Sequence, residues 1–143
     1  MIPSDDQLIA LYGSLMRGIG PLESLGFAKG LRFLGPCVVA GRLFDLGPYP
    51  ALRPGPGRVR GELHALRDSR LLDELDEFEG TDSEHPAQSL YLRERIRLID
   101  PPDVEAWCYI YAGTPDPTSR IEDGDWRAHL ARRKGHAPTR DGS

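Results

Sequence analysis

The sequence predicts an α+β fold in which about five to six strands form a curled sheet or small barrel with about three short helices around it. Three observations support this class. Runs that are apolar on both sides, or that alternate apolar with polar residues, outnumber runs with helical periodicity. The two kinds of run do not alternate regularly along the chain, as they would in a parallel α/β fold. The length of 143 residues suits a single domain with one hydrophobic core.

The first half of the chain contains two strand candidates with a helix between them. Residues 8–12 are apolar on both faces, which predicts a short buried strand. Residues 21–28 begin with a proline and predict a short helix with Leu25 among its inward-facing side chains. Residues 31–46 form the longest strand candidate, which we expect to bend at Pro36 because proline cannot donate to a central ladder.

Glycine and proline mark the next connections. Residues 45–50 and 53–57 are rich in both, so the first predicts a turn and the second a loop. Residues 58–65 alternate apolar and polar side chains, which predicts a half-buried strand. Glu62 and His64 belong to the polar set and are expected to face solvent.

The second half of the chain predicts two more strands and a final helix. Residues 81–89 are polar throughout and predict a loop. Residues 91–99 predict a strand, and residues 104–112 are apolar on both faces, as in the centre of a sheet. A helix over 125–133 completes the fold.

Composition limits the domain organisation and the partners. We expect one domain over residues 1–133 and a flexible C-terminal tail over 134–143, which is polar and contains glycine and proline. The formal charge of −4 offers no basic surface for nucleic acid. No apolar run is long enough to cross a bilayer, and residues 1–7 lack the cationic start of a signal peptide. We therefore expect a cytoplasmic monomer, with a weak dimer as the alternative, that binds neither nucleic acid nor membrane.

Cysteine and histidine spacing gives no support for a metal site. Cys37 and Cys108 lie in apolar, strand-like runs and are expected to be buried free thiols. Two isolated cysteines make neither a disulfide framework nor a zinc site. His85 and Glu84 share a loop, but the sequence contains no His-x-x-x-His or Cys-x-x-Cys spacing. We expect no metal and no cofactor.

The strongest functional signal is a helix that ends at Gly80, a residue type that suits the left-handed position after a helix. Leu72 and Leu75 lie on the apolar face of this helix. Glu79 follows Leu75 by four residues and Leu72 by seven, so it projects from the same face. A carboxylate that faces a core must find donors, take up a proton, or take part in chemistry.

Two interpretations of Glu79 remain open at this point. In the first, an apolar pocket raises the pKa of the carboxyl toward neutrality, which suits a general acid or base. In the second, Glu79 forms a structural salt bridge to Arg93, Arg95 or Arg97. Periodicity alone favours neither.

The segment Tyr12-Gly13-Ser14-Leu15 is the second candidate. A glycine after a buried strand allows close approach to a ligand, and backbone N–H groups in such a loop can bind a carboxylate or an oxyanion. A simple turn is the alternative. Ser14 as a nucleophile has little support, because no Gly-x-Ser-x-Gly elbow surrounds it. Tyr91 begins a strand after the polar loop and is either a core residue or a ligand contact.

Seven segments follow one another in an order and spacing that are specific when taken together. They are Tyr12-Gly13-Ser14-Leu15, Gly41-Arg42-Leu43-Phe44-Asp45-Leu46 with Tyr49-Pro50, Val59-Arg60-Gly61-Glu62-Leu63, Leu75-Asp76-Glu77-Phe78-Glu79-Gly80, Tyr91-Leu92-Arg93, Ala106-Trp107-Cys108-Tyr109-Ile110-Tyr111, and Ile121 with Gly124-Asp125-Trp126. Together they resemble the gamma-glutamylcyclotransferase-like family, which includes gamma-glutamylamine cyclotransferase-like proteins, from about residue 8 to residue 126.

The resemblance implies a small mixed β-barrel of about five to six strands with flanking short helices and a cavity at one end. The family's catalytic glutamate matches Glu79, and its substrate loop matches Tyr12, Gly13, Ser14 and Leu15. The implied enzyme is a gamma-glutamyl cyclotransferase. In its reaction the α-amine of a γ-glutamyl group attacks the γ-carbonyl, and 5-oxoproline and a free amine or amino acid are released. No metal or organic cofactor is implied.

Two alternatives to this activity stay open. The chain could be a binding module that keeps the pocket without the chemistry, or a Ser14-dependent amidohydrolase that releases free glutamate. The family also acts on several γ-glutamyl compounds, so the leaving amine is not specified. Residues 81–89 form a longer segment than in compact members and could be a lid or a specificity loop.

Overall fold

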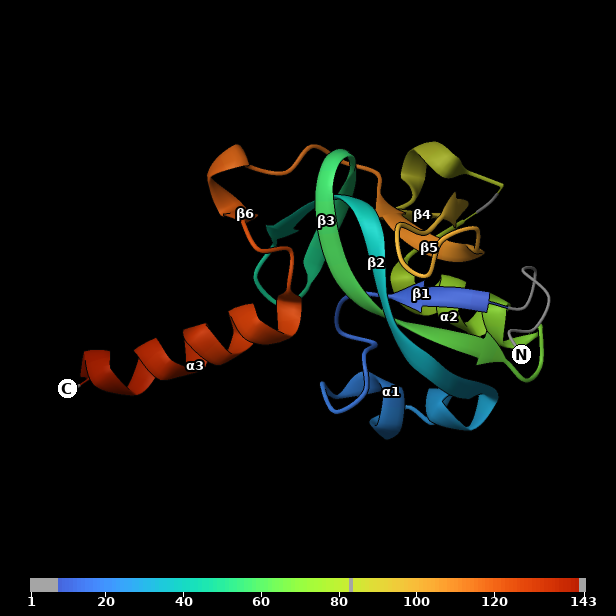
Figure 1. Ribbon diagram of the computed structural model, residues 1–143, viewed down its shortest axis with the longest axis horizontal. Coiled ribbons are helices and arrows are strands. Elements are labelled where there is room, and N and C mark those ends of the chain that lie inside the picture. Colours follow the sequence, from blue (N-terminus) through green and yellow to red (C-terminus); the bar gives the residue numbers. More distant parts are fainter. Residues whose placement is uncertain (1–7, 83, 142–143) are drawn as a thin grey trace.

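Six strands form one mixed sheet in the computed structural model, which describes residues 8–82 and 84–141. The strands are β1 (Leu8–Leu11), β2 (Leu31–Asp45), β3 (Pro50–Leu66), β4 (Tyr91–Arg97), β5 (Glu105–Tyr111) and β6 (Arg120–Ile121). Their order in the sheet is β4-β5-β1-β3-β2-β6. Figure 1 labels each strand. The α+β prediction is confirmed. Because β4 and β6 are the two edges, the sheet is curled but not closed, so the word barrel describes it loosely.

Strand β1 lies in the interior of the sheet and pairs with a strand on each side. It pairs antiparallel with β3 on one side and parallel with β5 on the other. The other ladders, β2–β3, β2–β6 and β4–β5, are antiparallel. All four residues of β1 are buried, as expected for a strand with two neighbours and an apolar side chain at each position.

The β2–β3 hairpin is longer than the sequence suggested. Its tight turn lies where the first glycine- and proline-rich run predicts it, with the Leu46 N–H donating to the Tyr49 carbonyl at 3.0 Å. The second run, residues 53–57, is not a free loop as predicted but belongs to β3. The ladder pairs Arg42 with Arg53 and then Ala40 with Arg58, so the intervening residues form a bulge. A bulge accommodates prolines because its extra residues need no ladder partner.

The helices are α1 (Pro21–Ser24), α2 (Leu71–Glu79) and α3 (Trp126–Asp141), and the 3₁₀ helices are η2 (Phe27–Gly30), η3 (Pro86–Gln88) and η4 (Pro117–Ser119). Helix α2 ends as predicted, because Gly80 has φ 70° and ψ 37° in the left-handed region. The predicted helix over 21–28 is divided into α1 and η2 by Gly26, which has φ 80°. Leu25 next to this break is 55% exposed, so its predicted inward position is wrong.

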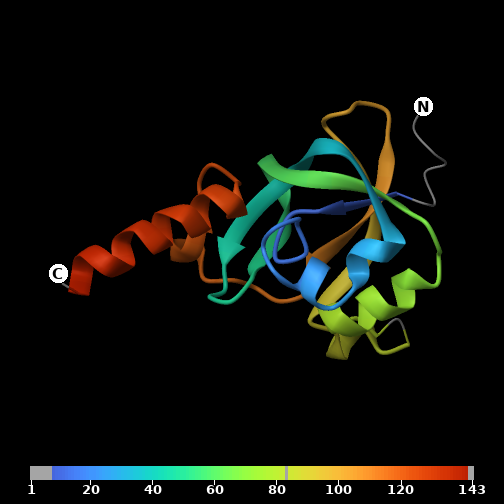
Figure 2. The ribbon, with the colours of Figure 1, turned by 90° about the horizontal axis from the view of Figure 1, so that it is seen from below.

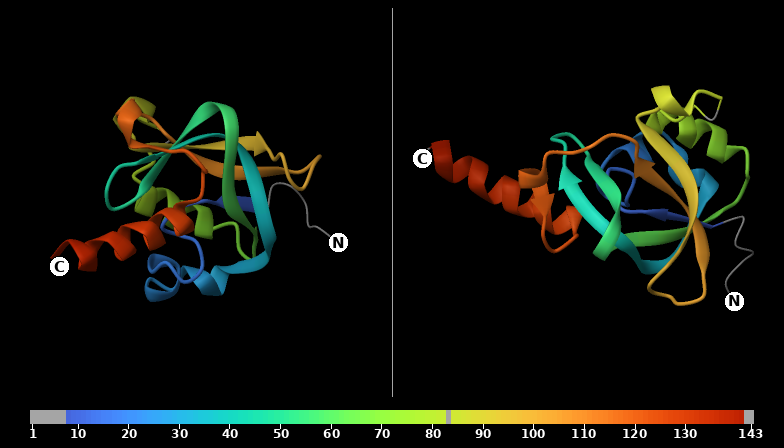
Figure 3. Two further views of the ribbon diagram at one scale, coloured as in Figure 1. Left: turned by 60° about the vertical axis from the view of Figure 1, so that its left-hand side comes forward. Right: turned by 90° about the horizontal axis from the view of Figure 1, so that it is seen from above.

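Helix α3 begins where predicted but continues past residue 133 to Asp141. Trp126 in its first turn is 1% exposed and packs into the core, whereas the C-terminal end of the helix projects away from the sheet in each view (Figures 1, 2 and 3). The flexibility of residues 134–143 and the domain boundary at 133 remain predictions.

The core contradicts one prediction and confirms another. Glu62 and His64, expected on a solvated face, are 6% and 2% exposed. The segment that follows β1 and the first turn of α3 cover this face, a tertiary effect that strand alternation does not encode. Cys37 and Cys108 are buried and free, as predicted, and burial raises the pKa of Cys37 to about 12. Among the described residues, no helix is long and apolar enough to cross a bilayer.

Candidate active site

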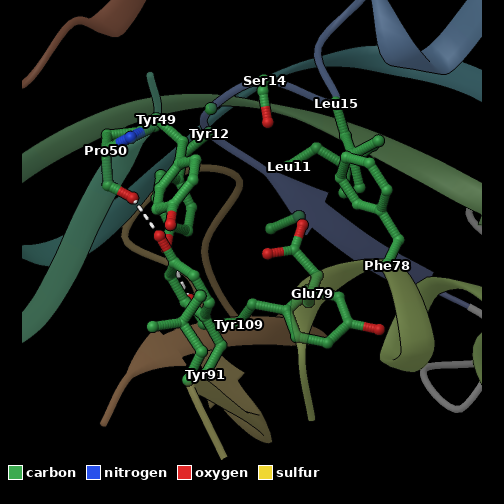
Figure 4. A pocket seen from close by; sticks show the side chains of 13 residues that line it. Leu11, Tyr12, Ser14, Leu15, Tyr49, Pro50, Phe78, Glu79, Tyr91 and Tyr109 are labelled. Carbon is green, nitrogen blue, oxygen red and sulfur yellow. Dashed lines mark hydrogen bonds between the residues drawn. The ribbon is translucent and has the colours of Figure 1, made fainter. Parts of the chain in front are cut away.

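A cavity of about 210 Å³ opens where the end of β1 meets the end of α2. It is lined by Ala10, Leu11, Tyr12, Gly13, Ser14, Leu15, Tyr49, Pro50, Phe78, Glu79, Leu90, Tyr91 and Tyr109. This set includes each of the six residues that the sequence singled out. The structure therefore places the candidate acid/base, the candidate loop and Tyr91 around one space (Figure 4).

Five segments that are distant in the sequence build the walls of the cavity. The segment after β1 lies on one side, and the last turn of α2 brings Glu79 and Phe78 to the other. The tip of the β2–β3 hairpin contributes Tyr49 and Pro50. The first residue of β4, Tyr91, and Tyr109 of β5 complete the lining.

Glu79 points into the cavity, between the tyrosines on one side and Phe78 and Leu15 on the other (Figure 4). No hydrogen bond or ion pair joins its carboxyl to any residue of the described ranges. The predicted alternative of a structural salt bridge is wrong, because Arg93 pairs with Asp76, and Arg95 and Arg97 pair with acidic residues of the β4–β5 hairpin. Burial, together with the negative charge of Asp76, raises the pKa of Glu79 to about 7.

Asp76 is a functional neighbour that the sequence reading did not single out. It precedes Glu79 by three residues, one helical turn, and its Oδ1 accepts hydrogen bonds from Arg93 Nε at 2.7 Å and from the Tyr109 hydroxyl at 2.7 Å. Arg93 also lies over the ring of Trp107, 4.3 Å from its centroid. The one-turn spacing between Asp76 and Glu79 can be read from the sequence and indicates that the two side chains are neighbours. The partners of Asp76 on β4 and β5 are known only from the fold.

The hydroxyls of Tyr12 and Tyr91, near Glu79, both donate hydrogen bonds to backbone carbonyls. Tyr12 donates to the Tyr109 carbonyl at 2.6 Å, and Tyr91 donates to the Pro50 carbonyl at 2.6 Å. Burial raises the pKa of Tyr12 and of Tyr91 well above the ordinary value, so both remain protonated. Of the side chains that line the cavity, Glu79 is the only carboxyl, and its pKa is suited to proton transfer near neutral pH.

The segment 12–15 is a turn with free backbone donors. The Met16 N–H donates to the Gly13 carbonyl at 3.0 Å and closes the turn. The N–H groups of Gly13, Ser14 and Leu15 are hydrogen-bonded to no residue of the described ranges, so they are available to a carboxylate or an oxyanion on a ligand.

Gly13 is required for space and not for an unusual backbone conformation. Gly13 is not among the residues with positive φ, so no left-handed backbone conformation requires a glycine here. A Cβ at this position would instead lie 2.7 Å from Pro50 Cγ and 2.9 Å from Pro50 Cδ. The absent side chain lets the turn pack directly against the hairpin tip.

Ser14 has its hydroxyl toward the cavity but no base beside it (Figure 4). The three histidines whose side chains the structure describes are each bonded to a carboxylate: His64 to Glu62, His85 to Asp82 and His129 to Asp45. None of them is hydrogen-bonded to Ser14. Among the side chains that the structure describes, Ser14 therefore has no base to form the nucleophile–base pair that serine chemistry requires.

The polar segment before β4 is pinned to the site at both of its ends. The Thr81 hydroxyl donates to the Tyr91 carbonyl at 2.6 Å, and the Leu90 N–H donates to the Gly80 carbonyl at 2.8 Å. Within the segment, the Asp82 N–H donates to Ser89 Oγ at 2.7 Å. These bonds fix Leu90 at the rim of the cavity, where it is 40% exposed.

Comparison with known proteins identifies relatives of this chain. The family model described as gamma-glutamyl cyclotransferase, AIG2-like, matches residues 9–128. The gamma-glutamylcyclotransferase family protein YtfP of Escherichia coli strain K12 is 36% identical over 85 residues, a match that covers 59% of this chain and 66% of that protein. The sequence match thus spans just under two thirds of the relative's length.

Solved structures have the same fold. The solution structure of ytfP from Escherichia coli superimposes with a TM-score of 0.61 at 30% identity, covering 86% of this chain and 98% of that chain. The crystal structure of PH0828 from Pyrococcus horikoshii superimposes with a TM-score of 0.69, covering 92% of this chain and 98% of that chain. At 21% identity, the second likeness concerns the fold alone.

Proposed function

The chain belongs to the gamma-glutamyl cyclotransferase, AIG2-like family, and from this premise we propose that it cyclises a γ-glutamyl amine or amino acid, releasing 5-oxoproline and the free amine. One observation carries the proposal. Glu79, a carboxyl with a pKa of about 7 and no partner among the described residues, points into a small cavity. Beside it lies a turn whose N–H groups are also without partners in that part of the chain. Such a carboxyl can take up and return a proton at cellular pH.

The proposed chemistry is an intramolecular aminolysis. Glu79 accepts a proton from the α-ammonium of the γ-glutamyl group, and the freed amine attacks its own γ-carbonyl. A C–N bond closes the five-membered ring as the C–N bond to the leaving amine breaks. Glu79 then returns the proton to the leaving nitrogen, acting first as base and then as acid. The ionised carboxylate next removes the second proton of the ring nitrogen, and this proton departs with the released amine as an ammonium ion. The atoms balance without water, metal or organic cofactor.

The cavity contributes by holding the substrate in a folded conformation. A volume of about 210 Å³ is below the usual range for ligand pockets of roughly 300–1,000 Å³, which suits a ligand the size of one glutamyl group. The free N–H groups of Gly13, Ser14 and Leu15 would bind the α-carboxylate or the developing oxyanion. Tyr12 and Tyr91 supply rigid walls that bring amine and carbonyl together, a proximity effect.

The test is a mass-spectrometric product assay on a panel that includes γ-glutamyl-alanine, γ-glutamyl-ε-lysine and several γ-glutamyl amines. The parent protein should form 5-oxoproline, and Glu79→Gln should lower turnover at least about 100-fold, the usual scale for a lost general base. Glu77→Gln is the matched control, because Glu77 lies on the exposed face of the same helix. Undiminished turnover in Glu79→Gln would rule out the mechanism.

The same assay separates the two alternatives. A Ser14-dependent amidohydrolase would release free glutamate, and Ser14→Ala would abolish its activity. In the cyclotransferase, Ser14 contributes its backbone N–H, so Ser14→Ala should reduce turnover by less than about 10-fold, the scale of one neutral hydrogen bond. Binding of γ-glutamyl compounds without any product would indicate a binding module.

A further inference from the structure

The buried carboxylate of Glu62 lies outside the cavity, and the proposed chemistry does not use it. Its side chain is 8% exposed and is surrounded by donors. Oε1 accepts from the Arg17 N–H at 3.0 Å and from His64 Nε2 at 3.1 Å, and Oε2 accepts from Arg17 Nε at 3.3 Å and from an Arg127 Nη at 3.0 Å. Burial alone would raise the pKa of Glu62, but these hydrogen bonds and charges lower it, so the group is ionised at neutral pH.

The contacts of this group converge on Arg17, the second residue after the Tyr12–Leu15 turn. Glu62 holds the N–H of Arg17, and the same Arg127 nitrogen that bonds Glu62 also donates to the Arg17 carbonyl at 2.9 Å. The Arg17 guanidinium lies over the ring of Phe33, 3.4 Å from its centroid. The N–H of Arg17 is therefore held by Glu62 of β3, and its carbonyl is held by Arg127 of the first turn of α3. We call these two contacts the Arg17 clamp.

The clamp acts on the segment that lines the cavity. The Met16 N–H donates to the Gly13 carbonyl at the end of the Tyr12–Leu15 turn, and Arg17 follows Met16 directly. At its other end the turn is continuous with β1, which is fixed in the sheet. The position of the N–H groups at Gly13, Ser14 and Leu15 thus depends on β1 before the turn and on the Arg17 clamp after it.

An apolar residue would fill the Glu62 position at lower desolvation cost, because burying a charge is expensive and is seldom a net gain in stability. The hydrogen bond that the Arg17 N–H donates to Glu62 suggests that the carboxylate has a role other than stability. It fixes a turn whose own donors are unpaired and that therefore has little internal hydrogen bonding to hold its shape.

We propose that Glu62, together with Arg127, is a positioning residue that holds the Tyr12–Leu15 turn in its substrate-binding arrangement through the backbone of Arg17. This proposal rests on the proposed function for the identity of the ligand. It predicts a role in binding and not in proton transfer, since Glu62 does not line the cavity.

The experiment compares steady-state kinetics of Glu62→Gln and Arg127→Ala with the parent. Glu62→Gln keeps the size of the side chain but removes its charge and turns one acceptor oxygen into a donor. Loss of charged hydrogen bonds on this scale should raise KM about 10-fold or more in both variants, while kcat changes less than about 3-fold. Arg127→Ala keeps the test valid if Glu62→Gln folds poorly, because the Arg127 side chain is 49% exposed.

Arg132→Ala is the matched control. Arg132 also lies on α3 and also forms an ion pair, with Asp123 at 3.0 Å, but it does not contact the turn. Its KM should equal that of the parent. An equal rise of KM in Arg132→Ala would overturn the proposal, because the effect would then come from the helix in general. A fall of kcat at unchanged KM in Glu62→Gln would also overturn it.

Amide hydrogen exchange tests the clamp independently of any substrate. In Glu62→Gln the amides of Met16 and Arg17, which are hydrogen-bonded in the parent, should exchange faster, while those of β1 and β3 keep their rates. Unchanged exchange at Met16 and Arg17 would overturn the proposal even if the enzyme is active. If the parent forms no 5-oxoproline but the exchange is local, the proposed function fails and the clamp stands.

Discussion

Glu79 combines two properties that are seldom found in one surface-accessible carboxyl. It is turned into a cavity without a partner in the described chain, and burial together with Asp76 brings its pKa to about 7. Near neutral pH, protonated and ionised forms are then present in similar amounts. A group that must act first as base and then as acid benefits from this balance, because neither state is costly to reach.

The raised pKa has a consequence for stability. A carboxyl whose folded pKa lies above its unfolded value destabilises the fold once it must ionise, so the cost is absent below about pH 4.5 and grows as pH rises to about 7. Glu79→Gln should therefore leave the melting temperature unchanged at pH 4 and raise it by several degrees at pH 8, a gain of about 1–3 kcal/mol. Thermal unfolding at both pH values measures this. A lower melting temperature at pH 8 would indicate a structural role for the carboxylate.

Asp76 should set the pH dependence of the reaction. Its negative charge raises the pKa of Glu79, so Asp76→Asn should lower that pKa and leave Arg93 as an added positive neighbour. The acidic limb of the kcat/KM profile reports the ionisation of the free enzyme's base and should move to lower pH. Glu77→Gln, an exposed change on the same helix, should leave the limb in place. A limb that does not move in Asp76→Asn would show that another group controls it.

At the scale of elements, the cavity depends on contact between the turn after β1 and the hairpin tip. Gly13→Ala would place a Cβ 2.7 Å from Pro50 Cγ, so one of the two segments must shift. Displacement of about 1 Å can cost about 100-fold, and we expect kcat/KM to fall by 10- to 100-fold. The double variant Gly13→Ala/Pro50→Ala should recover most of the loss, because it removes the ring atoms that clash. A double variant as impaired as the single one would show that the clash is not the cause.

Features of α2 could be predicted because their signals are local. The apolar face, the glycine that ends the helix and the position of Glu79 on that face all follow from spacing within ten residues or so. The turn at Gly13 follows from a glycine after an apolar run. These local signals point to Glu79 and to the Tyr12–Leu15 segment, but not to Tyr49, Pro50 or Tyr109, which complete the cavity. They also do not give the reason for Gly13, which is its contact with Pro50.

Other features could not be predicted because they depend on what covers a strand. Alternation in β3 predicts that Glu62 and His64 face solvent, but both are buried. The fold brings Arg17 and Arg127 to Glu62, and Phe33 to the ring of His64. Residues 53–57 have the composition of a loop, but their pairing is decided by β2. The sequence shows that Asp76 precedes Glu79 by one helical turn. It does not show that β4 and β5 bring Arg93 and Tyr109 to Asp76.

At the scale of the molecule, the C-terminal helix has two parts with different roles. Trp126 is buried in the core and Arg127 contacts Glu62, whereas the helix beyond residue 133 extends away from the sheet in Figures 1 and 2. A chain that ends after Arg133 should keep its melting temperature within about 2 °C of the full chain, since it retains the buried Trp126.

Trp126→Ala in the full chain is the comparison for this truncation. Loss of a buried tryptophan should cost about 3–5 kcal/mol and lower the melting temperature by about 10 °C. Thermal unfolding of both variants measures the difference. If the truncated chain is as unstable as Trp126→Ala, residues 134–143 belong to the folded domain and the boundary at 133 is wrong.

The single parallel ladder of the sheet, between β1 and β5, affects the order of events during synthesis. It joins two antiparallel units, residues 8–66 and residues 91–111, and Tyr12 bonds Tyr109 across the junction. Each unit can close soon after it leaves the ribosome, but β1 must wait for β5 before this ladder forms. A nascent chain that has released Glu79 and the Tyr12–Leu15 turn still lacks Tyr91 and Tyr109, so its cavity has no far wall. Substrate can therefore stabilise the chain only after most of it has been made, and it gives no help to the earlier steps of folding.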